Sequence, residues 1–342
     1  MSHYYVSVRA LVLRRPGDLV VADVDRPTPG RDEVLVRVKH TGICGTDLKI
    51  FTGGMPASHP IIMGHEISGE LADGKKDPRP GTSVLVDPVL YCGSCADCVA
   101  RRTNLCAAGG VIGREVNGGF AEYVVAPRSH VYPLPPSIDS QIAPLIQVLT
   151  TCLHAQRRGG VCSGHSVAVL GLGVSGQLHV QLAKARGAVT VVGITRSAWK
   201  RSLAHRLGAD LTAGGGDEGV RVVQEATEGR GADIVIESTG HVRSLADAIA
   251  MVRPGGTIIL FGIYTAGEGA LPFYQLYYKE PTIVSARAAT PEDFPESIDL
   301  VARGAVKLSP LVTQILPLSQ LRDALGMLEG DIDGRMKIIL EH

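Results

Sequence analysis

A stretch of four closely spaced cysteines limits the fold more than any other part of the sequence. Cys92, Cys95, Cys98 and Cys106 follow the spacing C-x2-C-x2-C-x7-C. Four thiolates at this spacing can close a tetrahedron around one Zn²⁺ and leave no position for a substrate. Two disulfides or an iron–sulfur cluster are the alternatives. We predict a structural zinc that stabilises the fold and takes no part in chemistry.

The composition describes a globular protein with no sign of a nucleic-acid or membrane partner. The chain has 342 residues, which favours two domains, and its 34 Lys and Arg balance its 34 Asp and Glu. Residues 1–10 lack a basic region followed by an apolar one, and no apolar run approaches the roughly 18 residues of a membrane span. We therefore expect a soluble cytoplasmic protein, a setting in which disulfides are rare.

The pattern of the sequence changes near residue 150. Before it, short β-type runs such as 6–13, 33–39 and 62–71 are separated by Gly and Pro, and no helical period of any length occurs. This part is predicted to be mainly β. From Ser166, strand-like and helix-like segments alternate, which predicts a parallel sheet with helices on both faces. A last strand at 336–340 needs a partner, and we expect it to return to the opening β-domain.

A glycine motif opens the alternating part. Gly171-Leu-Gly173-Val-Ser-Gly176 follows a buried strand and begins a helix, a context in which G-x-G-x-x-G is typical of dinucleotide binding. Gly171 permits the tight turn, Gly173 leaves room for a pyrophosphate, and Gly176 lets helix and strand pack closely. The alternative is a glycine turn that binds no ligand.

The end of the next strand bears on the choice of dinucleotide. An acidic residue about 20 positions further on would hold the ribose diol of NAD. This chain has Thr195-Arg196 there, with Lys200 and Arg201 nearby and no Asp or Glu from 177 to 209. Cations beside a hydroxyl suit a 2′-phosphate better than a bare diol. We favour NADP over NAD; the alternative is that these cations form a solvated helix face.

A second set of metal-ligand residues lies in the β-rich part. Gly42-Ile-Cys44-Gly-Thr46-Asp47 is followed by Gly64-His65-Glu66. A thiolate, an imidazole and a carboxylate make three zinc ligands with a fourth position open, the arrangement of a catalytic site. Taken singly, Cys44 could be a small buried hydrophobe, His65 a core histidine and Glu66 a surface acid.

Together these motifs resemble the zinc-containing medium-chain alcohol and polyol dehydrogenase family over essentially the whole chain. The segments 42–47, 64–66, 92–106, 117–123 and 171–176 occur in that family's order. The resemblance implies an α/β protein with a mainly β, GroES-like catalytic domain at 1–150 and 285–342, which includes the structural zinc lobe. A Rossmann domain with a doubly wound parallel sheet is implied at 151–284, and a homodimer or homotetramer is expected.

The same resemblance implies an NAD(P)-dependent oxidoreductase of a secondary alcohol, polyol or sugar-like substrate. Cys44 and His65 would hold a catalytic zinc, with Glu66 a ligand in some states, and Thr46 would pass the substrate's hydroxyl proton onward. The zinc would favour the ionised hydroxyl, and hydride would then move to the nicotinamide ring. The dinucleotide is expected to contact Gly171, Gly173, Val174, Ser175, Gly176, Thr195, Arg196, Lys200, Thr239 and Gly240.

Two positions depart from the family pattern. Lys49 stands where relatives often have a His that completes the proton relay. Because the usual pKa of lysine is near 10.4, we expect Lys49 to bind an anionic or polyhydroxyl substrate while the proton leaves through water. Gln147 stands where the family usually offers a further zinc ligand of Glu, Asp or Cys, and its neutral carbonyl is a weaker donor. Glu66 is therefore expected to be a permanent ligand; a weak or empty catalytic site is the alternative.

Two other functions fit the same motifs. One is a threonine- or amino-alcohol-type dehydrogenase that uses NAD. The other is a dinucleotide-binding zinc protein without dehydrogenase activity, which the departures at Lys49 and Gln147 would suit. In the two enzyme interpretations the expected partner is a small alcohol or carbonyl compound.

Overall fold

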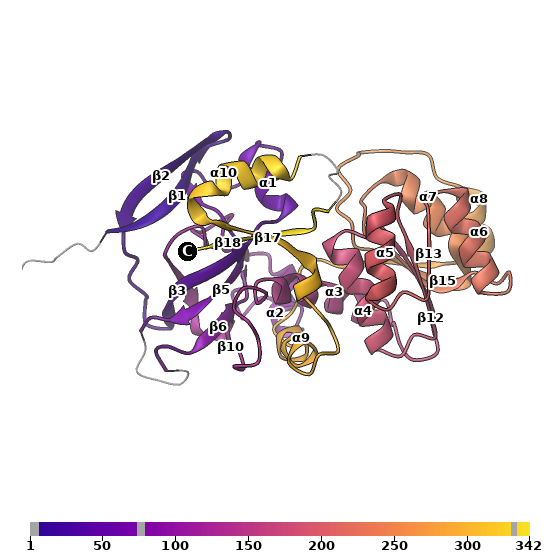
Figure 1. The fold of residues 1–342 in the computed structure, drawn as a ribbon, viewed down its shortest axis with the longest axis horizontal. Helices are drawn as coiled ribbons and strands as arrows, with labels where there is room; N and C mark the ends of the chain where they lie inside the picture. Colours follow the sequence, from indigo (N-terminus) through magenta and orange to yellow (C-terminus); the bar gives the residue numbers. More distant parts are fainter. Residues whose placement is uncertain (1–6, 74–78, 330–333) are drawn as a thin grey trace, which may run out of the picture. The chain divides into compact units, whose positions relative to one another are not determined.

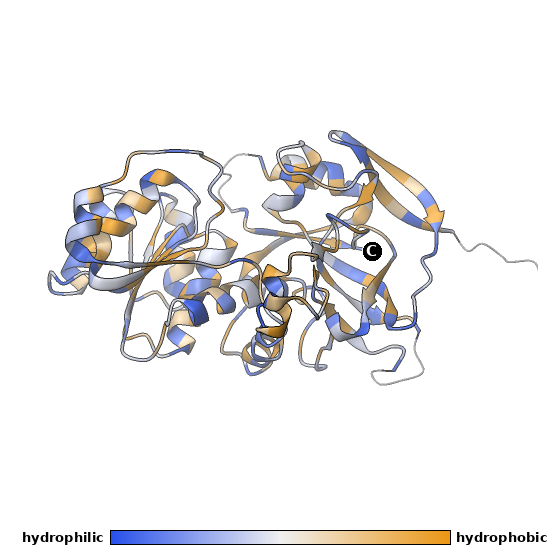
Figure 2. Ribbon diagram, turned by 180° about the vertical axis from the view of Figure 1, so that it is seen from behind, coloured by the Kyte–Doolittle hydropathy of each residue, from blue (hydrophilic) through white to orange (hydrophobic). Residues whose placement is uncertain are grey.

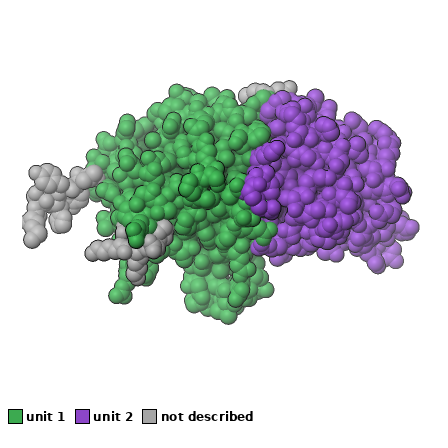
Figure 3. Space-filling view, turned by 60° about the horizontal axis from the view of Figure 1, so that its bottom comes forward, with its two compact units in different colours: residues 1–148, 290–302, 308–342 green, residues 149–289, 303–307 purple. Residues whose placement is uncertain are grey.

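The computed structural model describes residues 7–73, 79–329 and 334–342; the first residue of the predicted strand 6–13 and most of the segment 1–10 lie outside this part. The described chain forms two compact units (Figure 3). Unit 1 comprises described residues of 1–148, 290–302 and 308–342, and unit 2 comprises 149–289 and 303–307. No helix of the described residues is both long and apolar enough to cross a membrane.

Unit 1 is built mainly from β-strands. Its largest sheet has the order β10-β6-β5-β3-β18-β17 with β9 also paired to β3, and two smaller sheets have the orders β2-β1-β4 and β7-β8. The strands are β1 Ser7–Arg15, β2 Asp18–Asp25, β3 Glu33–Gly42, β4 Ile61–Ile62, β5 Glu66–Leu71, β6 Ser83–Val86, β7 Val89–Leu90, β8 Gly110–Val111, β9 Tyr123–Pro127, β10 Val131–Pro133, β17 Val312–Pro317 and β18 Lys337–Glu341. The helices that lie wholly in this unit are α1 Gly45–Phe51, α2 Ala96–Val99, α9 Asp293–Ala302 and α10 Leu321–Met327.

The returning strand predicted from the sequence is β18. It pairs antiparallel with β3, with Ile339 opposite Gly42 (Figure 1). Ile338 and Leu340 alternate with it and are buried in the core cluster that also holds Ile43. Two segments almost 300 residues apart in sequence therefore support each other where β3 ends.

Two local details of unit 1 differ from the prediction. The run 62–71 is broken between β4 and β5 at Gly64, whose φ is +93°. A Cβ at Gly64 would lie 2.7 Å from the ring of Phe120, so the chain needs glycine there. Helix α1 occurs where no helix was predicted, because its seven residues are too few to show a clear hydrophobic period.

Unit 2 contains one six-stranded sheet in the order β13-β12-β11-β14-β15-β16, and every neighbouring pair is parallel. The strands are β11 Ser166–Leu170, β12 Thr190–Ile194, β13 Leu211–Ala213, β14 Ala232–Glu237, β15 Val252–Leu260 and β16 Thr282–Ser285. The helices are α4 Val174–Ala185, α5 Ala198–Arg206, α6 Asp217–Ala226, α7 Val242–Met251 and α8 Phe273–Lys279, while α3 Leu145–Arg158 crosses the boundary between the units.

Helices cover both faces of this sheet, as the alternating pattern predicted. Val167 and Val169 of β11 belong to a core shared with α4 and α5, whereas Ala168 and Leu170 belong to a second core shared with α6 and α7. Successive residues of one strand thus enter opposite cores, which explains why the strand is apolar throughout. Figure 2 shows the hydrophobic strands between the helices.

Candidate active site

Two antiparallel strands bring the candidate metal ligands together. In the β3–β5 ladder, Gly42 lies opposite Glu66. Cys44 comes just after β3, and His65 comes just before β5, so both lie at this same point of the ladder. The ligand atoms of Cys44, His65 and Glu66 all lie within 4.8 Å of one another. A thiolate, an imidazole and a carboxylate therefore face one small volume.

Asp47, to which the sequence analysis gave no role, orients the histidine. Its side chain is fully buried. Oδ2 accepts the backbone N–H of Cys44 at 2.8 Å, and Oδ1 lies 3.3 Å from Nδ1 of His65. A histidine whose Nδ1 faces a carboxylate presents Nε2 to a metal. The signal was present in the sequence, since Asp47 is the third residue of the short helix that follows Cys44.

The contacts among Asp47, His65 and Cys44 also shift the pKa values of His65 and Cys44. Burial disfavours the thiolate, but the hydrogen bond and charge of His65 prevail and lower the pKa of Cys44 below its usual value. Burial also opposes an imidazolium, but Asp47 and then Cys44 raise the pKa of His65 well above its usual value. An activated thiol, an oriented imidazole and a carboxylate form a donor set that fits zinc.

Lys337 is a second site residue to which the sequence analysis gave no role. Its ammonium group lies 2.6 Å from Oε1 and 2.5 Å from Oε2 of Glu66, and it donates to the carbonyl of Ile43 at 2.8 Å. The Lys337 and Glu66 side chains are only 5% and 1% exposed. A single cation at the start of the apolar strand β18 was the available signal, but its partner is 271 residues away in the chain.

The remaining predicted residues of this region lie on two helices. Thr46 and Lys49 are three residues apart on α1, so they share a face, and both are half-buried. Gln147 lies in the first turn of α3 and is buried, with 8% of its surface exposed. Their roles remain predictions.

The four-cysteine segment forms a compact sulfur cluster. Its thiols are all free, and the Sγ–Sγ distances are 3.9 Å for Cys92–Cys98, 3.9 Å for Cys95–Cys106 and 3.6 Å for Cys92–Cys106. A tetrahedron with zinc–sulfur bonds of about 2.3 Å has edges of about 3.8 Å, whereas a disulfide is about 2.05 Å long. The cluster fits a tetrathiolate ion and is too wide for disulfides.

The glycine motif of unit 2 forms a tight turn with close packing between helix and strand, as is typical of dinucleotide-binding motifs. Gly171 has φ of +88°, and a Cβ on Gly176 would lie 1.8 Å from the carbonyl oxygen of Gly171. A Cβ on Gly173, in contrast, would meet nothing within 4 Å. Gly176 is thus needed for close packing, while Gly173, just before α4, borders open space. Val174 and Ser175 begin that helix, whose N-terminus favours an anion.

Comparison with known proteins identifies the family. A model described as alcohol dehydrogenase GroES-like domain matches residues 30–136, and one described as zinc-binding dehydrogenase matches residues 175–303. The L-galactonate-5-dehydrogenase of Escherichia coli K12 is 34% identical over 323 residues, which cover 93% of this chain and 94% of that protein. The chain belongs to the zinc-binding dehydrogenase family.

Solved structures agree with this assignment. A zinc-binding dehydrogenase of Sinorhizobium meliloti 1021, bound to NADP, shares 32% sequence identity with a TM-score of 0.91; the match covers 98% of this chain and 100% of that one. An alcohol dehydrogenase of Escherichia coli CFT073, complexed with NADH, is 28% identical with a TM-score of 0.91 and covers 98% and 99%. The predicted fold class is confirmed, and the protein is an NAD(P)-dependent oxidoreductase that acts on alcohols.

In this dehydrogenase, Arg201 holds the turn at Thr195-Arg196 in place, although it was not among the residues expected to contact the dinucleotide. Nη1 of Arg201 donates to the carbonyls of Thr195 and Arg196, each at 2.8 Å. Ser197 caps α5 by accepting the N–H of Lys200 at 3.4 Å. Arg201 therefore shapes the turn after β12, and the exposed side chain of Arg196 extends from that turn.

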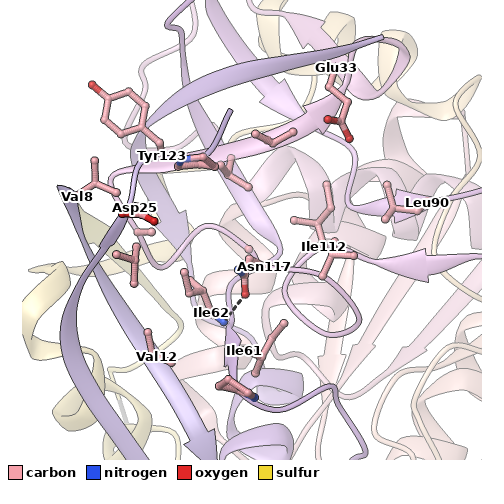
Figure 4. Close-up of a pocket in the computed structure, with 18 of the residues that line it drawn as sticks. Val8, Val12, Asp25, Glu33, Ile61, Ile62, Leu90, Ile112, Asn117 and Tyr123 are labelled. Atoms are coloured by element: carbon pink, nitrogen blue, oxygen red, sulfur yellow. Dashed lines mark hydrogen bonds between the residues drawn. The ribbon is translucent and has the colours of Figure 1, made fainter. Parts of the chain in front are cut away.

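A separate apolar cavity of about 470 Å³ lies in unit 1 of the dehydrogenase (Figure 4). The side chains of Ile61, Ile62 and Ile112 line it, and Asn117 accepts the N–H of Ile62 at 3.0 Å. Among the described residues that line it, none is a candidate zinc ligand. The cavity is instead lined in part by β4, whose last residue, Ile62, lies three positions before His65 in the chain.

Proposed function

We propose that this dehydrogenase interconverts a secondary alcohol of a polyol or sugar-like substrate with its ketone at a zinc site formed by Cys44, His65 and Glu66. The convergence of these three ligand atoms within 4.8 Å carries the proposal. The similarity to L-galactonate-5-dehydrogenase supports the substrate class, because that name denotes action on a polyhydroxylated sugar acid. A second zinc, purely structural, would be held by Cys92, Cys95, Cys98 and Cys106.

Different residues of unit 1 are proposed to bind the metal, to orient its histidine ligand and to transfer the proton. When bound, zinc supplies a Lewis acid that lowers the pKa of a substrate hydroxyl. Cys44, His65 and Glu66 would hold it, and Asp47 keeps His65 in the orientation that binding needs. The hydroxyl of Thr46 can accept the substrate's proton and donate its own, so it passes the proton toward water. We propose that unit 1 is the catalytic domain and unit 2 the dinucleotide-binding domain.

A substrate panel tests the proposed function. Purified zinc-loaded protein would be given secondary alcohols, polyols, sugar acids, L-threonine and the matching ketones with NADP or NAD. The absorbance of the reduced nicotinamide ring in the near ultraviolet reports hydride transfer. We expect turnover with polyhydroxylated substrates. Turnover with L-threonine alone would replace the proposed substrate class, and a metal-loaded protein that transfers hydride with no member of the panel would overturn the function.

Lys49 is proposed to bind the substrate. Since Lys49 shares the face of α1 that carries Thr46, Lys49→Ala is expected to raise KM for an anionic or polyhydroxyl substrate about tenfold, the effect of losing one charged hydrogen bond. A simple alcohol without further hydroxyls should be affected less than threefold. Steady-state kinetics on both substrates at several pH values checks this. Unchanged KM and an unchanged pH profile would refute the role.

Arg196 is proposed to favour NADP. Its side chain is exposed at the turn that Arg201 holds, a position suited to a 2′-phosphate. Arg196→Ala is expected to raise KM for NADP about tenfold and to change KM for NAD less than twofold, because NAD lacks that phosphate. Arg206→Ala, at the other end of α5, is the matched control. An equal effect on both nucleotides would contradict the preference.

We propose that the chain forms a homodimer or homotetramer through one edge of unit 2. Strand β16 is the last strand of its sheet, and α8, the helix that precedes it in the chain, has no buried residue among the described ones. The side chains of Phe273, Tyr274, Tyr277 and Tyr278 are 68–81% exposed. A two-fold axis would bury this face against its own copy.

Charged substitutions in the exposed aromatic face of α8 test the proposed oligomer. Tyr277→Asp with Tyr278→Asp should shift the sedimentation coefficient toward that of a monomer, because two charges would then be buried in the interface. Val189→Asp, which changes an apolar residue that is 62% exposed outside this face, should leave the assembly intact. A wild-type protein that sediments as a monomer would rule out the proposal.

A further inference from the structure

A buried carboxylate, which was not among the predicted cofactor contacts, lies at the edge of the unit 2 sheet where its parallel strands have their carboxyl ends. Glu237 is the last residue of β14 and is 0% exposed. It lies beside Leu170 of β11 on one side and Leu260 of β15 on the other. From β11 the sheet continues to β12 and β13 in one direction and to β14, β15 and β16 in the other. Ligands of such sheets bind beyond the carboxyl ends of the strands, at this point of reversal.

The Glu237 carboxylate accepts hydrogen bonds from four donor groups in two loops. Oε1 accepts the N–H of Thr239 at 2.8 Å and is also contacted by the Thr239 hydroxyl. Oε2 accepts the N–H of Gly240 at 3.0 Å and the phenol of Tyr264 at 2.7 Å. Burial and then the bond to Glu237 raise the pKa of Tyr264 above its usual value, so the phenol remains a donor at neutral pH.

The backbone of Glu237 binds the second loop as well. Its carbonyl accepts the N–H groups of Phe261 and Gly262, each at 2.9 Å. The loops are packed so closely that a Cβ on Gly262 would lie 2.1 Å from the nitrogen of Gly240. The loop after β14 and the loop after β15 therefore form one surface, and Glu237 lies beneath it.

The order of strands indicates which part of the cofactor meets this surface. The pyrophosphate belongs above Gly173, next to β11, and the adenosine ribose belongs at Thr195-Arg196, after β12. Because β12 lies on one side of β11 and β14 on the other, the nicotinamide half must extend over the loops after β14 and β15. Thr239 and Gly240 belong to the first of these loops.

We propose that Glu237 is a positioning residue for the nicotinamide half of the cofactor. It fixes Thr239, Gly240 and Tyr264 in one preformed binding surface for the nicotinamide ring. The inference rests on the proposed cofactor-binding site and adds to it a residue that need not touch the cofactor. A glutamine at this position would keep the shape, but its amide NH₂ would face donors that now meet an oxygen.

Strand β14 offers a matched control at its opposite end. Asp233 accepts the N–H and hydroxyl of Ser166 and the guanidinium of Arg253, at 2.7–2.8 Å. It is thus a carboxylate with a comparable set of donors, but it lies at the amino end of the strand, away from the crevice. Asp233→Asn should lower thermal stability without acting on the nicotinamide ring.

The experiment compares dinucleotides with fragments that lack only the ring. Dissociation constants of the zinc-loaded enzyme would be measured by calorimetry for NADP against 2′-phospho-ADP-ribose and for NAD against ADP-ribose. We expect Glu237→Gln to weaken the dinucleotide about ten- to hundredfold, as loss of hydrogen bonds to a charged group implies, and the fragment less than threefold. Tyr264→Phe should act in the same direction with a smaller effect, and kcat should fall in both variants.

The outcomes separate this inference from the proposed function. Equal weakening of dinucleotide and fragment by Glu237→Gln, or no weakening, would overturn the positioning role while leaving cofactor use intact. An Asp233→Asn variant with the same selective loss would also overturn it. A wild-type enzyme that binds neither nucleotides nor fragments would overturn the proposed site together with this inference. Tyr264→Phe carries the same test if Glu237→Gln does not fold.

Discussion

Replacing Cys44 by serine is expected to reduce kcat/KM at least about a thousandfold while the protein remains folded. A neutral hydroxyl is a poor zinc ligand, so the site would lose the ion that stabilises developing charge, an effect worth several kcal/mol. Zinc analysis should fall from two ions per chain to one, because the cluster from Cys92 to Cys106 is untouched. Circular dichroism and the melting temperature should remain close to those of the wild type.

Cys162→Ser is the control, since this exposed thiol belongs to neither cysteine-containing cluster. It should retain two zinc ions and full activity. A Cys44→Ser enzyme that still holds two zinc ions and turns over at the wild-type rate would show that the metal lies elsewhere. One zinc in the active wild type that Cys44→Ser also retains would show that catalysis does not need the proposed catalytic ion.

Replacing Lys337 by methionine is expected to destabilise the zinc-free protein by about 3–5 kcal/mol, the cost of leaving a buried charge without its partner. Glu66 is the group left unpaired, because Lys337 contacts both of its oxygens. If Glu66 is a permanent zinc ligand, the zinc-loaded variant should lose much less stability, because the ion then compensates the carboxylate. Urea unfolding of both proteins, with zinc and after chelation, measures the difference.

Two controls make this result specific. Lys337→Arg keeps the charge and should remain within about 1 kcal/mol of the wild type, the range of a typical net hydrogen bond. Lys279→Met removes a lysine whose ammonium donates to the carbonyls of Ile249, Ala250 and Val252 in unit 2, so the effect of its loss should not depend on zinc. A zinc-independent effect of Lys337→Met would contradict a bond between Glu66 and the ion, as would a zinc-bound crystal structure with Glu66 well beyond about 2.2 Å.

Local motifs were the part of the site that sequence could predict. The cysteine cluster and the glycine turn each lie within a short stretch, so their spacing alone encodes the geometry. Cys44 and His65 lie next to the ends of different strands, yet each belongs to a recognisable sequence segment. In each case the residue types indicated the kind of site, a metal site or a dinucleotide site, before any fold was known.

Contacts between distant segments were not predictable in the same way. Lys337 pairs with Glu66 only because β18 lies beside β3, and nothing in the local sequence of either residue indicates the other. Glu237 likewise ends an ordinary buried strand, and its role depends on Tyr264 in the loop after a different strand. Arg201 was grouped with the phosphate-binding cations, whereas its guanidinium bonds to backbone carbonyls.

The pairing of β18 with β3 has a consequence for biosynthesis. On the ribosome, β3 and the segments that carry Cys44 and His65 emerge early, but their neighbouring strand and the ammonium group that faces Glu66 are translated roughly 270 residues later. Until then the edge of β3 is uncovered and Glu66 has no counterion, while unit 2 can already fold. The uncovered strand edge of unit 1 is thus available for incorrect pairing through most of its synthesis.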